Sequence, residues 1–213
     1  MLTLYITRHG ETVWNTQKRM QGWSDSELTA NGISNAVSLG NRMKAIELDA
    51  IYASPSKRTI TTANLIKGRR EIPTILDENL REIHMGVWEG QTFSDIEQKY
   101  PIEYDAFWNT PQLYKSLNGE SFAMLHKRVL NAIHSIQDKH SSGNILIVTH
   151  SVVIKTLLAF FKNYPLEKIW EPPFIYDTSL TIIQLNGNKS NIVLEGDLAH
   201  REMDKQKEWS IND

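Results

Sequence analysis

The sequence predicts an α/β fold: a three-layer α/β/α sandwich with a mainly parallel central sheet and a small, mostly helical cap insertion. Two observations support this prediction. Apolar runs of strand length alternate along the chain with longer segments of helical periodicity. One run, at 144–149, is almost continuously apolar, as expected for a strand covered by helices on both faces of its sheet. We therefore expect a single domain over 1–213, with the cap at about 84–118.

The first half of the chain is predicted to contain three strands and two helices. The strands are runs of β-branched, aromatic and small apolar residues, and the first ends where the polarity changes abruptly at Arg8. Thr29 or Asn31 can cap the first helix. Ser54 and Pro55 suit the N-cap and N1 positions of the second. The expected strands are 2–7, 49–53 and about 73–76, and the expected helices are about 29–47 and 54–65.

The second half begins with the expected cap. Residues of about 92–116 are rich in aromatic and polar side chains and include two prolines, which favours an insertion over further sheet. Composition also predicts a hairpin turn at 186–189, and the polar last dozen residues are expected to be loosely held. The remaining elements are an amphipathic helix at about 122–136, a strand at 144–149, a helix at about 152–161, and strands at 176–185 and 191–194.

Composition excludes several classes of function. The net charge of -2 and the pI near 6.4 leave no broad basic field, so no binding to nucleic acid or to an anionic membrane is expected. The absence of cysteine excludes disulfides, thiolate metal sites and cysteine nucleophiles. Arg8 and His9 interrupt the apolar N-terminal run too early for a signal peptide or a membrane span. We therefore expect a cytoplasmic protein.

Three predicted strands are followed by side chains that suit an anion. Arg8 and His9 follow the first strand, Arg58 lies in the first turn of the helix after the second, and His150 follows the strand at 144–149. Ligands of α/β folds bind outside the carboxyl ends of the strands, so these residues are expected to converge. Arginine forks and a helix N-terminus both donate to phosphate oxygens. The sequence therefore predicts a phosphate site.

The same residues suggest a two-step phosphoryl transfer. A histidine with an unprotonated ring nitrogen can attack phosphorus, and His9 is the candidate nucleophile. Arg8, Arg58 and His150 would then stabilise charge on the equatorial oxygens. Glu82, in a polar loop beside the cap, is the candidate acid for the leaving oxygen and the base that activates water. This double role requires a raised pKa for Glu82.

Other kinds of site fit the sequence less well. His9, Glu82, His84 and His150 are possible metal ligands, but no His-x-x-x-His spacing or tight acidic cluster is present, and two arginines would oppose a cation. No metal is therefore expected. Ser151 lacks the Gly-x-Ser-x-Gly context of a serine hydrolase, and no Walker loop is present. The histidines interpreted as helix-surface or tail residues are His126, His134, His140 and His200.

The segment at 7–15, Thr-Arg-His-Gly-Glu-Thr-Val-Trp-Asn, closely resembles the histidine phosphatase superfamily, which includes the cofactor-dependent phosphoglycerate mutases. The resemblance covers nearly the whole chain. The other matching segments are 21–23, 28–32, 51–59, 62–63, 80–82, 86–90, 119–121 and 147–150.

The resemblance implies a role for each of the candidate residues. It makes His9 the phosphorylated histidine and Glu82 the proton donor, with the phosphoryl group held by Arg8, Arg58 and His150. These are the roles that the side-chain chemistry suggests independently. Further residues that the resemblance places around the phosphate or substrate are Asn15, Gln21 and Gly22. Nothing in the composition would have assigned them that role.

Two departures from the family pattern bear on function. Many members have Gly-Gly or Gly-Ala after the second histidine, where this chain has Ser151-Val152. The segment at 83–90 resembles the phosphatase branch rather than the mutases. We therefore expect a metal-independent phosphatase that needs no cofactor and acts on a small-molecule phosphate ester. A 2,3-bisphosphoglycerate-dependent phosphoglycerate mutase and a non-catalytic phosphate-binding module remain alternatives, and homo-oligomers are common in the family.

Aromatic and sulfur-containing side chains are candidates for an apolar mouth to the site. Such a mouth would suit bulky or hydrophobic phosphate esters, and the cap would then govern substrate choice. Ordinary core and cap packing is the alternative for each of them. The candidates are Trp14, Met20, Trp23, Phe107, Trp108 and Trp170.

Overall fold

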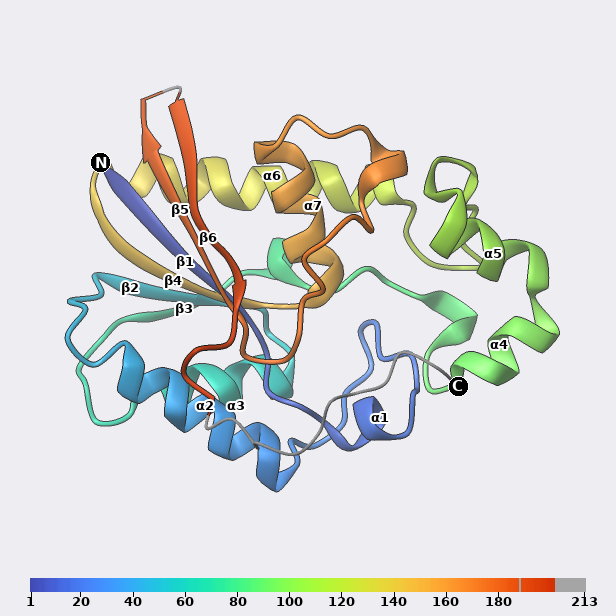
Figure 1. Ribbon diagram of the computed structural model, residues 1–213, viewed down its shortest axis with the longest axis horizontal. Helices are drawn as coiled ribbons and strands as arrows, with labels where there is room; N and C mark the ends of the chain where they lie inside the picture. The colour runs from blue at the N-terminus through green and yellow to red at the C-terminus, as the bar shows by residue number, and fades with distance from the viewer. Residues whose placement is uncertain (188, 202–213) are drawn as a thin grey trace.

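The computed structural model describes residues 1–187 and 189–201 (Figure 1). The strands are β1 (Leu2–Arg8), β2 (Ala50–Ala53), β3 (Thr74–Leu76), β4 (Gly143–Thr149), β5 (Leu180–Asn186) and β6 (Lys189–Asp197). They form one sheet in the order β3-β2-β4-β1-β5-β6. The first four strands in this order are parallel, while β5 is antiparallel to β1, and β6 to β5. The prediction of a mainly parallel sheet is confirmed.

Helices cover both faces of this sheet. The α-helices are α1 (Val13–Thr16), α2 (Ala30–Arg42), α3 (Lys57–Lys67), α4 (Phe93–Lys99), α5 (Pro101–Asn109), α6 (Phe122–Lys139) and α7 (Ser151–Phe161). Figure 1 shows α2 and α3 on one face and α6 and α7 on the other, which confirms the three-layer sandwich. None of the helices in the described part of the chain has both the length and the apolar character needed to cross a membrane.

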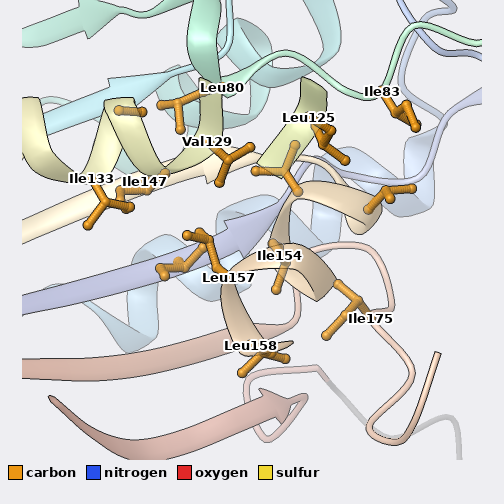
Figure 2. Close-up of a cluster of buried hydrophobic side chains, with 14 of the residues drawn as sticks. Leu80, Ile83, Leu125, Val129, Ile133, Ile147, Ile154, Leu157, Leu158 and Ile175 are labelled. Atoms are coloured by element: carbon orange, nitrogen blue, oxygen red, sulfur yellow. The ribbon is translucent and has the colours of Figure 1, made fainter. Parts of the chain in front are cut away.

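The hydrophobic core is divided between the two faces. Figure 2 shows the larger cluster, in which Leu125 and Val129 of α6 lie near Ile154 and Leu157 of α7. The apolar spacing of α6 puts its buried residues on one side, so this helix packs along the sheet. A smaller cluster, which includes Leu39 of α2, lies on the opposite face. Alternate side chains of β4 belong to the two clusters, so this strand is packed on both faces and the position of its carboxyl end is fixed.

The pairing of the two central strands positions the site. β1 and β4 are parallel, and their register sets Arg8 opposite Thr149. The backbone N–H of His9 then donates to the Thr149 carbonyl at 3.0 Å, so that the strand pairing continues one residue beyond β1. His9 and His150 therefore emerge side by side at the same edge of the sheet.

The start of α3 differs from the expectation. Ser54 and Pro55 were predicted at its N-cap and N1 positions, but the helix begins at Lys57 with Ser56 as its N-cap. The Ser56 side chain makes no capping hydrogen bond. Instead, the carboxylate of Asp25 accepts from the Lys57 backbone N–H at 2.8 Å. A residue from a distant loop therefore caps this helix, which local sequence patterns do not reveal.

Other helix and strand boundaries also differ from the predicted ones. The helix expected to reach 47 ends at Arg42, and Thr29 rather than Asn31 caps it, accepting from the Gly32 N–H at 3.0 Å. The strand expected from 176 begins at Leu180 because 176–179 forms a turn that returns to β1. The short helix α1 was not predicted, and β6 is longer than expected. Position 188 of the expected hairpin turn and the last dozen residues lie outside the described residues.

The segment expected to form the cap is mostly helical. It contains α4, α5 and two single 3-10 turns, η2 (Gly86–Trp88) and η3 (Pro111–Leu113). Figure 1 places α4 and α5 together at one end of the molecule, the end toward which β1 and β4 run. Phe107 of α5 is fully buried and stacks on Phe122 at the start of α6. This aromatic packing ties the segment to the sandwich.

Candidate active site

His9 and His150 lie against each other at the carboxyl edge of the sheet, as predicted. Their ring centroids are 5.3 Å apart in an edge-on arrangement. Both side chains are buried, with 3% of His9 and 1% of His150 exposed. Their imidazoles are therefore held by protein contacts rather than by solvent, and those contacts decide which nitrogen carries a proton.

The hydrogen bond of His9 defines its tautomer. Its Nδ1 lies 2.8 Å from the Gly10 carbonyl oxygen, which can only accept, so Nδ1 carries the proton and Nε2 keeps its lone pair. Burial, followed by the charges of Arg58 and Arg8, lowers the pKa of His9 well below its usual range. The ring is therefore neutral at physiological pH. This is the state that a nucleophilic histidine requires.

The carbonyl of Gly10 is held in position because the backbone around this residue is closely packed. A Cβ at this residue would lie 2.6 Å from the carbonyl oxygen of Gly32, at the start of α2. The Gly10 N–H also donates to the Thr62 hydroxyl of α3 at 2.9 Å. Contacts from two different helices thus orient the peptide that orients His9.

Arg58 is buried and held by four acceptors. Its Nη1 donates to the Asp25 carboxylate at 2.7 Å and to the Ser24 carbonyl at 2.6 Å. Its Nη2 donates to the Gly22 carbonyl at 2.8 Å and to Nδ1 of His150 at 3.1 Å. The Nε–H has no partner among the described residues. Arg58 therefore presents a fixed donor whose position the protein has set in advance.

His150 is neutral as well, with the opposite tautomer. A guanidinium can only donate, so Nδ1 of His150 accepts from Arg58, and the ring proton lies on Nε2, which is 2.8 Å from the Ser54 hydroxyl. Burial and the nearby charge of Arg58 lower its pKa well below the usual range. Both ring nitrogens are thus engaged by protein groups. The expected contact of His150 with a phosphoryl group stays a prediction.

Arg8, the last residue of β1, lines the same site as His9 and Arg58. Its Nη1 donates to the Ile175 carbonyl at 2.9 Å, and its Nε has no partner among the described residues. Arg8 and Arg58 thus each keep one buried Nε–H without a partner among the described residues, and both side chains belong to the same site. The arrangement suits the oxygens of a phosphoryl group.

Glu82 is buried close to the two arginines, with 8% of its surface exposed. Burial raises its pKa, although hydrogen bonds and the charges of Arg58 and Arg8 oppose the shift. Its Oε1 accepts from the Ile83 N–H at 3.0 Å, and its Oε2 from the Val152 N–H at 3.3 Å. The direction of the shift is the one that a general acid requires.

Ser151 has a contact that sequence reasoning missed. Its hydroxyl donates to Oε2 of Glu82 at 3.3 Å, and the backbone N–H of Val152 donates to the same oxygen. The departure from Gly-Gly after the second histidine thus adds a side-chain donor to the candidate acid. The only hint in the sequence was the departure itself.

A cavity of about 410 Å³ opens over these groups. Arg8, His9, Arg58 and Glu82 line one end, while His150 lies behind them and does not reach the cavity. The resemblance to known phosphatases pointed to further residues, all of which also line it, namely Asn15, Gln21 and Gly22. Much of the remaining wall is apolar and consists of Met20, Met85, Phe93, Phe107, Trp108, Val152, Trp170, Pro172, Phe174 and Ile175.

The expected apolar mouth is thus partly confirmed. Met20, Phe107, Trp108 and Trp170 line the cavity, but two of the six candidates do not. Trp14 lies against the backbone at Gly90. The Trp23 ring packs at a tilt against His84, and its Nε1–H donates to the Glu82 carbonyl at 2.8 Å. Trp23 therefore supports the loop of the candidate acid from outside.

The loop at 22–25 carries three of the four acceptors of Arg58, a role that the sequence did not predict for it. Glu89 accepts from the backbone N–H groups of Trp23 and Ser24 at 2.9 and 3.0 Å. Gly22 has a φ of 54°, and a Cβ there would lie 2.3 Å from the Glu89 carboxylate, so glycine is required. Glu89 lies in the segment at 86–90 that resembles the family. Asp25, which pairs with Arg58, had no signal in the sequence.

The remaining histidines lie away from the cavity. The described residues contain no group of three or more His, Cys, Asp or Glu side chains that could hold a metal ion. His126 and His134 are exposed on α6, as expected. His140 and His200 are half-buried instead, and hydrogen bond with Tyr52 at 3.0 Å and with Thr178 at 3.1 Å. The interpretation of these two as plain surface or tail residues was wrong.

Comparisons with known proteins identify the family of this chain. The family described as the histidine phosphatase superfamily (branch 1) matches residues 4–198. Phosphoserine phosphatase 1 of Hydrogenobacter thermophilus is 29% identical over 170 residues, which are 80% of this chain and 81% of that protein. Phosphoglycerate mutase-like protein 4 of Arabidopsis thaliana is 32% identical over 203 residues, covering 93% and 86% of the two chains.

A solved structure is similar throughout. YhfR of Bacillus stearothermophilus superimposes with a TM-score of 0.92 at 50% identity, covering 94% of this chain and 99% of that one. The family match spans most of the chain, and it includes all the groups that meet at the sheet edge. The chain therefore belongs to the histidine phosphatase superfamily.

Proposed function

We propose that this protein is a metal-independent phosphatase that hydrolyses phosphate monoesters through a phosphohistidine on His9. The observation that carries the proposal is the tautomer of His9: Nδ1 donates to the Gly10 carbonyl, so Nε2 is free to attack. The unused donors of Arg8 and Arg58 and the raised pKa of Glu82 support the same chemistry. The substrate is a small-molecule phosphate ester in the 410 Å³ cavity, and no further cofactor takes part.

In the first step, Nε2 of His9 attacks phosphorus while the bond from phosphorus to the ester oxygen breaks. Protonated Glu82 gives its proton to the departing oxygen, so the alcohol leaves neutral. Arg8 and Arg58 stabilise the charge on the equatorial oxygens. The Gly10 carbonyl, 2.8 Å from Nδ1, stabilises the positive charge that the ring acquires. The products of this step are an alcohol and phosphohistidine.

In the second step, Glu82 acts as a base. Its carboxylate takes a proton from water, and the water oxygen attacks phosphorus as the bond from phosphorus to Nε2 breaks. Inorganic phosphate leaves, and His9 and Glu82 return to their starting protonation states. One carboxyl group serves both steps because the reaction alternates its protonation state.

The cavity wall favours water over a sugar-acid hydroxyl as the acceptor. A mutase must hold and turn a small, highly polar phosphoglycerate, whereas the wall beyond the phosphate end here is mainly apolar. Relatives bear both kinds of name, phosphoserine phosphatase and phosphoglycerate mutase-like protein, so the acceptor is the point to test.

The test compares two substrates. The pure protein is incubated with 1-naphthyl phosphate, and separately with 3-phosphoglycerate with and without 2,3-bisphosphoglycerate, and products are quantified. We expect phosphate release from the naphthyl ester, unaffected by EDTA, and little isomerisation. Efficient isomerisation with little free phosphate would favour the mutase. No release from any ester of a broad panel between pH 5 and 8 would favour a phosphate-binding module.

A further inference from the structure

Lys155 is a buried cation in the wall of the cavity that the proposed mechanism does not use. It lies on α7, it is one of the residues that line the cavity, and 6% of its surface is exposed. Its ammonium donates to the backbone carbonyl of Glu171, beside Trp170 and Pro172 of the same wall. An ammonium has three N–H donors, so this single hydrogen bond leaves donors unused.

No acidic side chain pairs with Lys155 in the described part of the chain. The ion pairs found there involve other cations, including Lys162, which pairs with Glu195 on β6. A buried charge is costly unless it is paired, because little water reaches it. Burial and the charge of Lys162 lower the pKa of Lys155 to about 8, while Glu195 and Glu171 oppose the shift. The ammonium thus remains protonated near neutral pH.

Helix geometry places Lys155 away from the reacting phosphorus. α7 begins at Ser151, whose hydroxyl donates to Glu82, and runs away from the phosphate end. Four residues along a helix correspond to a rise of about 6 Å. A substrate held by Arg8 and Arg58 would therefore reach Lys155 with the far end of its leaving group, after crossing the apolar wall.

We infer that Lys155 recognises a carboxylate at the far end of the leaving group, so that the preferred substrates are esters with an apolar body and a terminal anionic group. This inference rests on the phosphatase function proposed above. The apolar wall would bury the body of the leaving group, and the carboxylate would supply the partner that the ammonium lacks. In a site of low dielectric constant such a pair is stronger than in water.

Arg19 is the competing cation of the cavity wall. Its Nη1 and Nε donate to the Gly90 carbonyl and to the side chain of Gln17, which hold it against its own loop. Arg19 is also less buried than Lys155. Variants of both residues are therefore needed to assign the carboxylate site.

The experiment uses a matched pair of esters: 3-(4-phosphonooxyphenyl)propanoate and its primary amide. The two methylenes insulate the phenol, so the leaving groups differ in charge rather than in reactivity. We expect wild type to favour the carboxylate by about 10-fold in kcat/KM, equivalent to about 1.4 kcal/mol. In Lys155→Met the ratio should fall to about one. Lys168→Met, which removes an exposed lysine outside the cavity, should retain the wild-type ratio.

The pH dependence adds a second measure. Deprotonation removes the charge, so the wild-type preference should be present below pH 8 and decline as the pH rises through about 8. The Lys155→Met ratio should be flat over this range. A wild-type ratio of one, a ratio unchanged in Lys155→Met, or a loss confined to Arg19→Met would overturn the inference.

A binding measurement separates this inference from the proposed function. The corresponding benzylphosphonates, with carboxylate or amide, cannot be hydrolysed, and quenching of Trp108 and Trp170 in the cavity wall reports their binding. The same preference is expected in the dissociation constants, and equal constants would overturn the role of Lys155. Absence of turnover with a retained binding preference would count against the phosphatase proposal and support the carboxylate site.

Discussion

The two ends of the cavity are built in different ways. At the phosphate end, charged and polar side chains come from strand ends, a helix start and the loop at Glu82, and buried hydrogen bonds fix them. At the distal end, aromatic and aliphatic side chains come from the cap helices and from the loop around Pro172, with Lys155 as a buried cation among them. The difference suggests that the first end determines the rate, while the second selects the leaving group.

The contrast has a physical basis. Stabilising a transition state requires donors placed within a few tenths of an ångström, which strands and helix termini provide. Binding an apolar leaving group depends on surface area and shape, which loops and short helices can vary without disturbing the sandwich. Substitutions at the phosphate end should therefore lower kcat for all esters, and substitutions at the distal end should change the order of preference.

The largest effect is expected from the nucleophile. His9→Ala should lower kcat by about 10⁴-fold for every ester, because no other group can form the covalent intermediate. It should also abolish acid-labile labelling by a ³²P-labelled substrate. His134→Ala, which removes an exposed histidine of α6, is the matched control. Labelling retained in His9→Ala would remove His9 from this role.

Arg58→Ala should lower kcat by about 10²–10³-fold, the typical loss when one donor to the transition state is removed. Asp25→Asn keeps the guanidinium but weakens the bond at 2.7 Å that orients it, so a smaller loss is expected. Arg69, exposed after α3, provides the control Arg69→Ala. If Arg58→Ala changed the order of ester preference more than the common rate, the proposed division between the two ends would be wrong.

Glu82→Gln should lower kcat/KM by about 10²-fold for alkyl phosphates and by less for 4-nitrophenyl phosphate, whose leaving group needs no proton. Burial raises the pKa of Glu82, so its acid form is present below that raised pKa and is lost above it. The wild-type kcat/KM should thus decline as the pH rises through this pKa. On the acidic side of the profile, kcat/KM should fall where His9 becomes protonated. The lowered pKa of His9 places that fall at a lower pH than for an ordinary histidine. An alkaline limb that persisted in Glu82→Gln would assign it to another group.

The smallest change in rate is expected at the distal end. Trp108 is partly buried in the cavity wall, so Trp108→Ala should alter the ratio of kcat/KM for 1-naphthyl and methyl phosphate by about 10-fold, mainly through KM. Tyr164→Ala, at an exposed aromatic residue outside this cavity, is the control. An unchanged ratio would mean that the cap aromatics serve packing alone. Phe107 is a poorer probe because it is fully buried and its removal would destabilise the fold.

Much of the phosphate end could be predicted because local patterns encode it. The apolar run at 144–149 and the change of polarity at Arg8 mark two strand ends, and parallel strands bring their ends to the same edge. His9 and His150 were therefore expected to meet. The distal end was harder to predict, since aromatic residues can serve either packing or a cavity wall, and for Trp14 and Trp23 the alternative of packing is the one that the structure supports.

Sequence patterns were enough to predict the sandwich, the meeting of Arg8, His9, Arg58 and His150, and Glu82 as the candidate acid. Periodicity and polarity mark the strand ends and helix starts, and the parallel sheet that they predict brings those ends to one edge. The tautomers of the two histidines, the cap that Asp25 provides to α3, and the raised pKa of Glu82 arise from the packing of the folded chain. These properties depend on contacts between segments far apart in the chain, and on burial that only their packing creates.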